Sequence, residues 1–534
     1  MTEKTNDENE IRIDESPKPF CKSVRNYFRE YCVCSSIHGF RYFGEKRTHF
    51  ERAWWFIVFS ITLGICIFFI REVYKKWERS PVIVSFATTE TPIYEMPFPA
   101  VTICPESKSN LSLFNHTNIL QKIKQKKKLT ETEFKNFEYM ELICQGTDLV
   151  EKPRLPIFSA QFYDVLANVS VKFHNIFYDC NYMDKTIKCE ENFQPILTDE
   201  GLCYTFNMLD RSEIYNPNVV HYKDFHRSVS PSDKWSLENG YSEKAGLKAY
   251  PKRALMAGTK YGLKLTLLSY KSNIGYTCRS SLQGFRVMLH TPTRIPLFSQ
   301  QYFRVPLNQQ VVAAIQPNMI TTSDSVKMYN QSRRKCFFPS ERTLKYFKQY
   351  TSLNCKLECL TNYTLEVCKC VNFYMPHDNT TNLCGTAKIT CMKEAERRLQ
   401  LGILYKEINP EAKNTKVKEC DCKPICSDLT YDVETSQSDW QWREWYKGVP
   451  VNGLSFDYDK VHMSKLTLFF KSTQFITSQR HELYGPTDFL ANFGGLLGLF
   501  TGFSVLSLME IIYFLSVRLF CNIRLYGYWT GPEI

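Results

Sequence analysis

Residues 53–70 read AWWFIVFSITLGICIFFI, a run without a charged side chain that lies between Arg52 and Arg71. A helix rises about 1.5 Å per residue, so about 20 apolar residues cross the roughly 30 Å hydrocarbon core of a bilayer. With the residues up to Tyr74, the run is long enough to cross. About fifty residues precede it and no small-residue cleavage site follows, which argues against a signal peptide. The sequence therefore predicts a first transmembrane helix over 53–74.

A second apolar run covers 489–517 and contains a single charge, Glu510. It is longer than one straight crossing requires, which a tilted or broken helix would explain. We expect a second transmembrane helix over 486–517, a cytoplasmic N-terminal segment over 1–52 and a cytoplasmic tail over 518–534. Basic residues flank the first run on both sides, so the positive-inside rule does not choose the orientation.

Cysteines and glycosylation sequons indicate the orientation of the chain in the membrane instead. Sixteen of the 21 cysteines fall between Cys104 and Cys426, which is typical of a disulfide framework formed in an oxidising compartment. Residues 75–485 are therefore predicted to be extracellular, and the chain is predicted to be a multi-pass plasma-membrane protein with both termini in the cytoplasm. Six N-x-S/T sequons lie in the same region and support this assignment: Asn110, Asn115, Asn168, Asn330, Asn362 and Asn379.

The predicted fold class is an α+β membrane protein: two transmembrane helices with a large, disulfide-rich, mixed α/β extracellular domain. Strand-like runs occur at 100–103, 262–268, 285–289 and 465–470. The first and last of these lie near one membrane run each, so we expect them to pair in one sheet. Helical patterns occur at 133–143 and 340–350, the latter with Ser340 as its N-cap.

Ten cysteines between 336 and 426 predict a stiff ladder of disulfides. Zinc binding is the alternative, but extracellular thiols oxidise and no histidine is interleaved at ligand spacing. We therefore expect no metal.

The net charge of +12 raises the possibility of nucleic-acid binding, but the basic residues are scattered. One cluster, Lys122, Lys124 and 126–128, is interpreted as solvated surface, with a partner or lipid contact as the alternative. No serine-histidine-acid signature, phosphate-binding glycine loop or His-Glu-x-x-His motif occurs in the sequence. We expect no enzymatic activity, no cofactor and no nucleic-acid partner.

Glycines crowd the first half of the second apolar run, at Gly494, Gly495, Gly498 and Gly502. Close helix packing would explain such a stripe. Alternatively, the helix opens at 502–504, where glycine tolerates unusual backbone angles and serine can satisfy freed backbone groups. A ring of exposed carbonyls can then replace the hydration shell of an ion. One chain supplies only two helices, so such a pore requires an oligomer.

Glu510 supports the second interpretation. A carboxylate inside the bilayer costs about 2.5–3.5 kcal/mol on insertion scales, so it should face a water-filled cavity, where a ring of such groups would attract cations. A glutamate that reaches the inner headgroups is the alternative. Asn492, near the outer end of the run, is a weaker pore-lining candidate.

Four features then occur in order: Ile37-His38-Gly39, the stretch FPAVTIC at 98–104, the ten-cysteine block, and Gly502-Phe503-Ser504. This order resembles the degenerin/epithelial sodium channel/acid-sensing channel family over nearly the whole chain. Residues 355–376 are similar to its insect pickpocket branch. The resemblance implies a homo- or heterotrimer of like subunits that prefers Na⁺, is blocked by amiloride and has a sensory or epithelial role. It also implies palm, finger, knuckle, β-ball and thumb regions, with the thumb at about 336–426.

The resemblance also assigns roles to particular residues. Gly502, Phe503 and Ser504 would form the selectivity filter, and His38 with Gly39 a cytoplasmic gating motif. Tyr74 and Trp77 would form the wrist that couples the outer domain to the membrane. The tryptophan that acid-sensing relatives place before the first thumb cysteine is replaced here by Arg333-Arg334-Lys335, so proton gating is not inferred. The gate and pore lining would be formed by Ala491, Asn492, Gly495, Gly498 and Glu510.

Family spacing implies seven disulfides, and the two cysteines left over are predicted to pair with each other. The seven are Cys104–Cys203, Cys180–Cys189, Cys336–Cys426, Cys355–Cys422, Cys359–Cys420, Cys368–Cys391 and Cys370–Cys384, and the eighth is Cys144–Cys278.

Other functions stay open at this stage. A two-pass scavenger or lipid-transfer receptor would share the topology but would not require the glycine stripe or Glu510. An ATP-gated cation channel shares the two-helix plan but fits the cysteine ladder poorly. The stimulus is not predicted, and osmotic change, touch, a pheromone or a peptide are all possible. Membrane lipid and a possible extracellular ligand are the expected partners besides like subunits.

Overall fold

The computed structural model describes residues 20–79, 82–144, 154–228, 230–232, 235–409, 420–448 and 457–530. The predicted cytoplasmic residues 1–19 therefore lie outside the described part of the chain. Two compact units are present: one combines the N-terminal residues up to Ile83 with the residues from Glu482 onward, and the other is Val84–His481. The second unit nearly coincides with the residues predicted to be extracellular.

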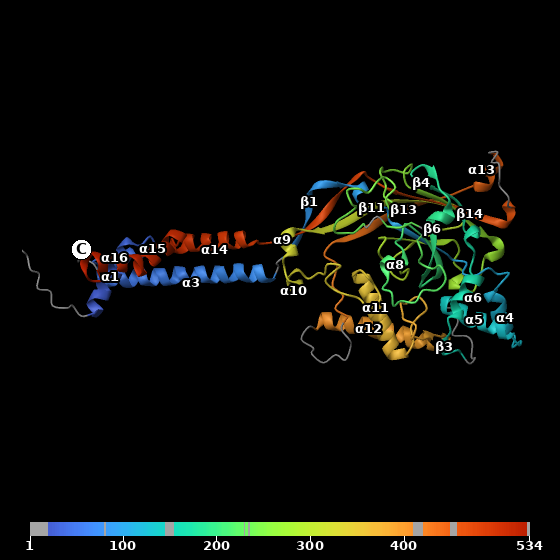
Figure 1. Cartoon of the computed structure of the whole chain (residues 1–534), viewed down its shortest axis with the longest axis horizontal. Helices are drawn as coiled ribbons and strands as arrows, with labels where there is room; N and C mark the ends of the chain where they lie inside the picture. The colour runs from blue at the N-terminus through green and yellow to red at the C-terminus, as the bar shows by residue number, and fades with distance from the viewer. Residues whose placement is uncertain are drawn as a thin grey trace, which may run out of the picture. The chain divides into compact units, whose positions relative to one another are not determined.

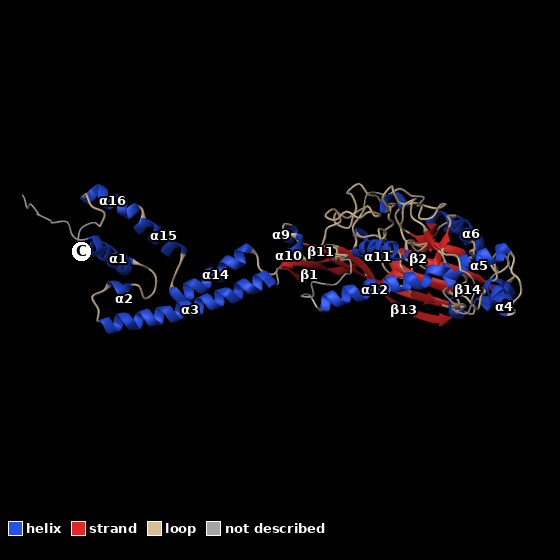
Figure 2. Ribbon diagram, turned by 90° about the horizontal axis from the view of Figure 1, so that it is seen from below, coloured by secondary structure: helices blue, strands red, loops and turns tan. Residues whose placement is uncertain are grey.

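The first unit is helical, and α14 lies alongside α3 in it (Figures 1 and 2). Its α3 contains the predicted first membrane helix and extends beyond it at both ends. Within the described residues, two helical segments are long and apolar enough to cross a membrane, His49–Arg79 and Val505–Tyr526. The helices of this unit are α1 (Phe20–Cys34), α2 (Arg41–Gly44), α3 (His49–Arg79), α14 (Pro486–Thr501), α15 (Val505–Leu515) and α16 (Val517–Tyr526).

The second apolar run is a broken helix, one of the two forms that its length indicated. It stops at Thr501, resumes at Val505 after Gly502-Phe503-Ser504, and breaks again at Ser516. Ser516 has φ −128° and ψ −76°, outside the helical region, so α16 starts a separate segment. The first part of the predicted tail, up to Tyr526, is therefore helical.

The second unit is built on two sheets. The larger has eight strands in the order β1-β15-β11-β14-β8-β4-β5, with β13 added along β11. The parallel pair β11–β14 lies near its centre, and β13 runs antiparallel to β11 from Gln309 to Ile320. Its strands are β1 (Val82–Pro92), β4 (Phe177–Tyr182), β5 (Lys185–Thr186), β8 (Leu263–Tyr270), β11 (Gln309–Thr322), β13 (Asp428–Asp439), β14 (Val461–Phe470) and β15 (Gln474–Glu482).

The smaller sheet has five strands in the order β10-β9-β2-β7-β6. Every residue of β2 is buried, which suits its β-branched Val-Thr-Ile sequence. The strands are β2 (Ala100–Pro105), β6 (Phe193–Thr198), β7 (Gly201–Phe206), β9 (Phe285–His290) and β10 (Phe303–Val305), and a separate pair is formed by β3 (Ile157–Phe158) and β12 (Leu383–Cys384).

The predicted pairing of 100–103 with 465–470 is wrong. All four predicted strands form, but β2 pairs with β7 and β9, whereas β14 pairs with β8 and β11. Proximity to a membrane segment in the sequence does not select a strand's partner. Complementary buried faces do, and these come from distant residues.

The helices of the second unit include the predicted one at 133–143, which lies within α5. The long α11 and α12 lie next to each other (Figure 1). The helices of eight or more residues are α4 (His116–Lys124), α5 (Glu131–Cys144), α6 (Gln161–Val169), α11 (Ser352–Cys368) and α12 (Ile389–Ile408), and the shorter ones are α7 (Cys189–Asn192), α8 (Arg211–Ile214), α9 (Asp324–Lys327), α10 (Gln331–Arg334) and α13 (Trp442–Gly448).

The predicted helix at 340–350 is wrong. Its backbone instead bonds to a distant segment: the Asn216 N–H donates to the Tyr346 carbonyl at 3.0 Å and the Lys348 N–H to the Ile214 carbonyl at 2.9 Å. In this arrangement the rings of Tyr346, Phe347 and Tyr350 are buried. The nearest helix, α11, begins only at Ser352. Thr351 is its N-cap, and the Thr351 hydroxyl accepts from the Asn354 N–H.

The structure contains the same eight disulfides that the sequence predicted. Two tie α11 to the irregular segment before β13, through Cys355–Cys422 and Cys359–Cys420, and Cys368–Cys391 ties it to α12. Each such bridge typically contributes about 2–4 kcal/mol. These bridges therefore hold α11 against its neighbours.

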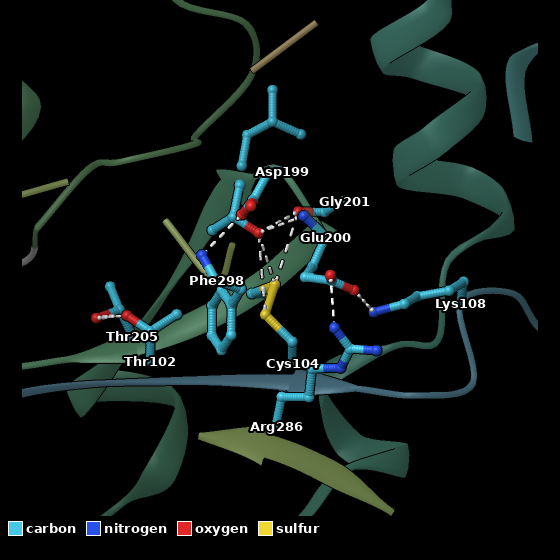
Figure 3. Close-up of a disulfide and its surroundings, with 12 residues drawn as sticks. Thr102, Cys104, Lys108, Asp199, Glu200, Gly201, Thr205, Arg286 and Phe298 are labelled. Atoms are coloured by element: carbon cyan, nitrogen blue, oxygen red, sulfur yellow. Dashed lines mark hydrogen bonds and ion pairs between the residues drawn. A yellow bond between two sulfur atoms is a disulfide. The ribbon is translucent and has the colours of Figure 1, made fainter. Parts of the chain in front are cut away.

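A buried ion-pair network surrounds the disulfide Cys104–Cys203 (Figure 3). Glu200 bonds to Arg286 at 2.8 Å and lies 3.0 Å from Lys108. Burial raises the pKa of Glu200, but the charges of Lys108, Arg279 and Arg286 outweigh that effect, so its pKa is lowered. The network links the β6–β7 turn to β9 and to the end of β2.

Candidate functional site

The break in the second apolar run is the centre of the candidate site. Gly502 has φ +68° and caps α14, a left-handed conformation that side chains other than glycine rarely adopt. Ser504 has an extended backbone and caps α15, where its hydroxyl accepts from the Ser507 N–H at 3.3 Å. The three residues predicted to form the filter are thus the three residues of the break.

The break frees backbone groups. In a continuous helix the Ser504 N–H would bond to the Phe500 carbonyl, but here it donates to Ser507 Oγ at 3.1 Å. Carbonyl groups at such a break are tolerated at membrane depth only where they face protein or water. The geometry therefore suits a polar pathway better than a lipid-facing surface.

The N-terminal segment around His38 contacts the break. The His38 N–H donates to the Thr501 carbonyl at 3.0 Å, and a Cβ on Gly502 would lie 2.8 Å from His38 Cγ. Gly39 has φ +90°, which lets the chain turn there, and Phe40 packs edge-on against Phe59 of α3. Two motifs that the sequence suggested separately, His38-Gly39 and the filter residues, are therefore in contact.

Glu510 is bound to the same segment. Its Oε2 accepts from the Ser36 N–H at 3.1 Å and from the Ser36 hydroxyl at 3.0 Å, and Ser36 Oγ lies 2.8 Å from Ser507 Oγ. Glu510 is half-buried as a residue, and Ser36 holds its carboxylate, so the side chain does not project freely. Its role as a pore-lining charge stays a prediction.

Helix α1 contacts a later part of the second apolar run, around Phe514, and the start of α16. Tyr27 donates to the Phe514 carbonyl, and Glu30 pairs with Arg518. The rings of Tyr31 and Phe514 are 5.3 Å apart. These contacts fix the N-terminal helix against α15 and α16.

The outer half of the run leaves its small residues uncovered by the single chain. A Cβ on Gly494 or Gly495 would meet no atom of the described residues within 4 Å, so these glycines do not serve packing within one chain. Ala491 is exposed, and the Asn492 side chain donates to the Asp488 carbonyl at 2.8 Å. The space beside these residues is open to another subunit or to water.

The predicted wrist residues lie at the end of α3. The ring centroids of Tyr74 and Trp77 are 5.9 Å apart. The ring centroids of Trp77 and of Phe489 in α14 are 5.5 Å apart. Phe489 belongs to the same helical unit as α3, so this contact lies within that unit, and the wrist role of Tyr74 and Trp77 stays a prediction. Ser36, Thr501 and Ser507 were missed, because single serines and threonines carry no spacing signal.

Three of the six predicted glycosylation sites are exposed, and three are half-buried. Asn168, Asn330 and Asn379 are exposed, whereas Asn110, Asn115 and Asn362 are half-buried. Asn115 caps α4, and Asn110 accepts from the Ser112 hydroxyl. Glycosylation stays a prediction at all six.

The lysine cluster lies at the end of α4, where Lys122 pairs with Glu133 at 2.6 Å and Lys124, Lys126, Lys127 and Lys128 are exposed. Within the described ranges, no group of three His, Cys, Asp or Glu side chains is placed to hold a metal ion.

A disulfide-stapled α+β unit joined to a helical unit with an opened apolar helix defines a class of membrane channel subunit. The family model for amiloride-sensitive sodium channels matches residues 31–514. The chain belongs to this family, which is one of ion channels and not of enzymes. Its members are multimeric plasma-membrane channels with two transmembrane helices.

Three relatives place the chain within the family. Pickpocket protein 28 of Drosophila melanogaster is 28% identical, over 92% of this chain and 79% of its own length. Sodium channel protein Nach of the same species is 23% identical, over 96% and 91%. Acid-sensing ion channel 1A of Danio rerio is 21% identical, over 90% and 86%. The resemblance to the pickpocket branch is confirmed, and these relatives indicate a sodium channel subunit.

Proposed function

We propose that the chain is the pore-forming subunit of a trimeric, sodium-selective, amiloride-blocked channel that its extracellular domain gates. The observation that carries this proposal is the break at Gly502-Phe503-Ser504, which frees backbone carbonyls within an apolar helix. Three copies of that break around one axis would form a ring of polar groups. Such a ring can replace the hydration shell of Na⁺.

In this arrangement the termini lie in the cytoplasm and 75–485 lie outside the cell. His38 and Gly39 approach the filter from the inner side and set its geometry through the Thr501 carbonyl. The Trp77–Phe489 contact couples α3 to the start of α14. A movement of the outer domain can then reach the gate at Ala491, while Asn492, Gly495 and Gly498 line the outer pore.

Voltage-clamp recording of cells that express only this chain tests the proposal. Inward current should fall when potassium replaces sodium outside the cell, and amiloride should block it. Ala491→Phe should hold the pore open and give a constitutive sodium current, because a bulky side chain at the small-residue gate prevents closure. Ser504→Lys should abolish current at unchanged surface protein, because three ammonium groups would repel cations. Unchanged sodium/potassium selectivity after replacement of Gly502 or Ser504 would refute the filter assignment.

A two-pass receptor is the second function considered. It is disfavoured because the chain belongs to a family of ion channels and because a receptor would not need an opened membrane helix. The stimulus is not proposed.

A further inference from the structure

Helix α1 has a stripe of exposed apolar side chains along one face. Val24 is 42% exposed, Phe28 is 53% exposed, and Cys21 is exposed as well. These residues recur at spacings of three and four, so they lie along one face of the helix. No described residue of the chain covers this part of the helix.

Another arc of α1 is fixed in place. Tyr27 and Glu30 bond to the chain around Phe514 and Arg518, and the Tyr27 ring is 5.9 Å from that of Trp529. These contacts fix the rotation of α1 about its axis, so the helix cannot turn to bury the stripe without losing them.

Positive charge lies next to the stripe. Lys22 and Arg25 are exposed on the adjoining arc of the helix. The one acidic residue of α1, Glu30, is already paired with Arg518. The neighbouring α16 also exposes apolar side chains, with Phe520 at 65% and Leu525 at 73%, and it contains arginines but no acidic residue.

We propose that α1 is an interfacial helix whose Val24–Phe28 stripe enters the inner leaflet while Lys22 and Arg25 bind anionic lipid headgroups. A helix with an apolar face and flanking basic residues has this preference, because burial of the apolar face and attraction to negative lipids act together. The inference rests on the proposed function only in that the N-terminus must be cytoplasmic.

A second copy of the chain is the other possible occupant. Symmetric contact between copies would bring Lys22, Arg25 and the arginines of α16 near one another without an exposed carboxylate on either helix to compensate. Like charges placed in this way are destabilising. Charge complementarity therefore favours an anionic lipid surface.

Spin labelling of the full-length chain in vesicles tests the proposal. The exposed free cysteines are first replaced (Cys21→Ser, Cys34→Ser, Cys521→Ser), and a nitroxide is then attached at Phe28→Cys. Collision with oxygen, which concentrates in the acyl region, is compared with collision with a water-soluble nickel complex. Ile65→Cys on α3 gives the lipid reference and Lys46→Cys, which is exposed outside the stripe, gives the aqueous one.

In vesicles of phosphatidylcholine with phosphatidylserine, the label at 28 should resemble that at 65. Neutralising Lys22→Gln and Arg25→Gln should weaken partitioning about fivefold per residue, whereas Lys46→Gln should not change it. A label at 28 that resembles the one at 46 would overturn the inference, as would one shielded from both reagents, which would indicate a protein contact. A water-exposed label at 65 would instead refute the membrane topology of the proposed function.

Discussion

The imidazole of His38 lies against Gly502, so close that a Cβ on Gly502 would stand 2.8 Å from His38 Cγ. Gly502 therefore meets two independent demands, a left-handed backbone at φ +68° and a ring packed on its Cα. The contact connects the N-terminal segment to the break in the second apolar run. Several consequences of the proposed pore can be tested there.

Gly502→Ala should reduce sodium current at least tenfold at unchanged surface protein. The left-handed backbone costs a side chain about 1–2 kcal/mol, and the new methyl group displaces His38. Adding His38→Ala removes the contact but not the backbone strain, so current should recover in part. Voltage clamp with surface biotinylation measures both quantities. Gly494→Ala, placed in open space, is the control, and wild-type current from Gly502→Ala would contradict the role of the contact.

Ser36→Ala should lower the sodium/potassium permeability ratio several-fold. The substitution removes the hydroxyl that bonds to Glu510 and lies 2.8 Å from Ser507 Oγ, next to the break. A hydrogen bond to a charged group contributes about 1.5–3 kcal/mol, enough to hold one backbone geometry over another. Reversal potentials in sodium and potassium solutions measure the ratio. Ser516→Ala, whose hydroxyl donates to the nearby Ile512 carbonyl, should leave the ratio unchanged.

Glu200→Gln should destabilise the outer unit by about 3–5 kcal/mol, because it leaves buried Lys108 and Arg286 without their shared carboxylate. The midpoint of thermal unfolding of the detergent-solubilised chain measures the effect. Glu191→Gln removes an exposed partner of Lys188, where water screens the charges, so it should leave the unfolding midpoint nearly unchanged. Equal effects of the two substitutions would show that the buried network is not a source of stability.

Elements marked by long apolar runs or by the family's cysteine and glycine patterns were predicted correctly, whereas contacts that no such pattern marks were not. Apolar runs, cysteine spacing and the glycine-serine break depend on neighbouring residues or on a family pattern, and each led to the right element. The error at 340–350 arose because Tyr346 and Lys348 bond through the backbone to 214–216, which no local pattern reveals. The contact of His38 with Gly502 was missed for the same reason. Both motifs were recognised, but nothing in their spacing brings them together.

Alkylation of the folded chain should label at most five cysteines: Cys21, Cys32, Cys34, Cys66 and Cys521. The exposed thiols Cys21, Cys34 and Cys521 should react first, whereas Cys32 is buried, and burial raises its pKa to about 11, so little thiolate is present. Peptide mass spectrometry after labelling gives the sites. A label on Cys144 or Cys278 would disprove the pair that was inferred because both cysteines were left over.

The outer unit should lose stability in acid through His290. Burial, with a smaller effect of Arg294, lowers the pKa of His290 to about 4, whereas an unfolded histidine titrates near 6.5. Between these values the unfolded chain binds a proton that the folded chain does not, so stability falls as the pH falls from about 6.5 towards 4. The loss amounts to at most about 3 kcal/mol. Thermal unfolding of the full chain at several pH values should show this slope. His290→Gln should make it shallower by the share of one histidine, because burial also lowers the pKa values of His226 and His221, which keep contributing. His174→Gln, at a ring that is largely exposed beside Glu190, should leave the slope as it is. An unchanged slope in His290→Gln would mean that other groups carry the acid sensitivity.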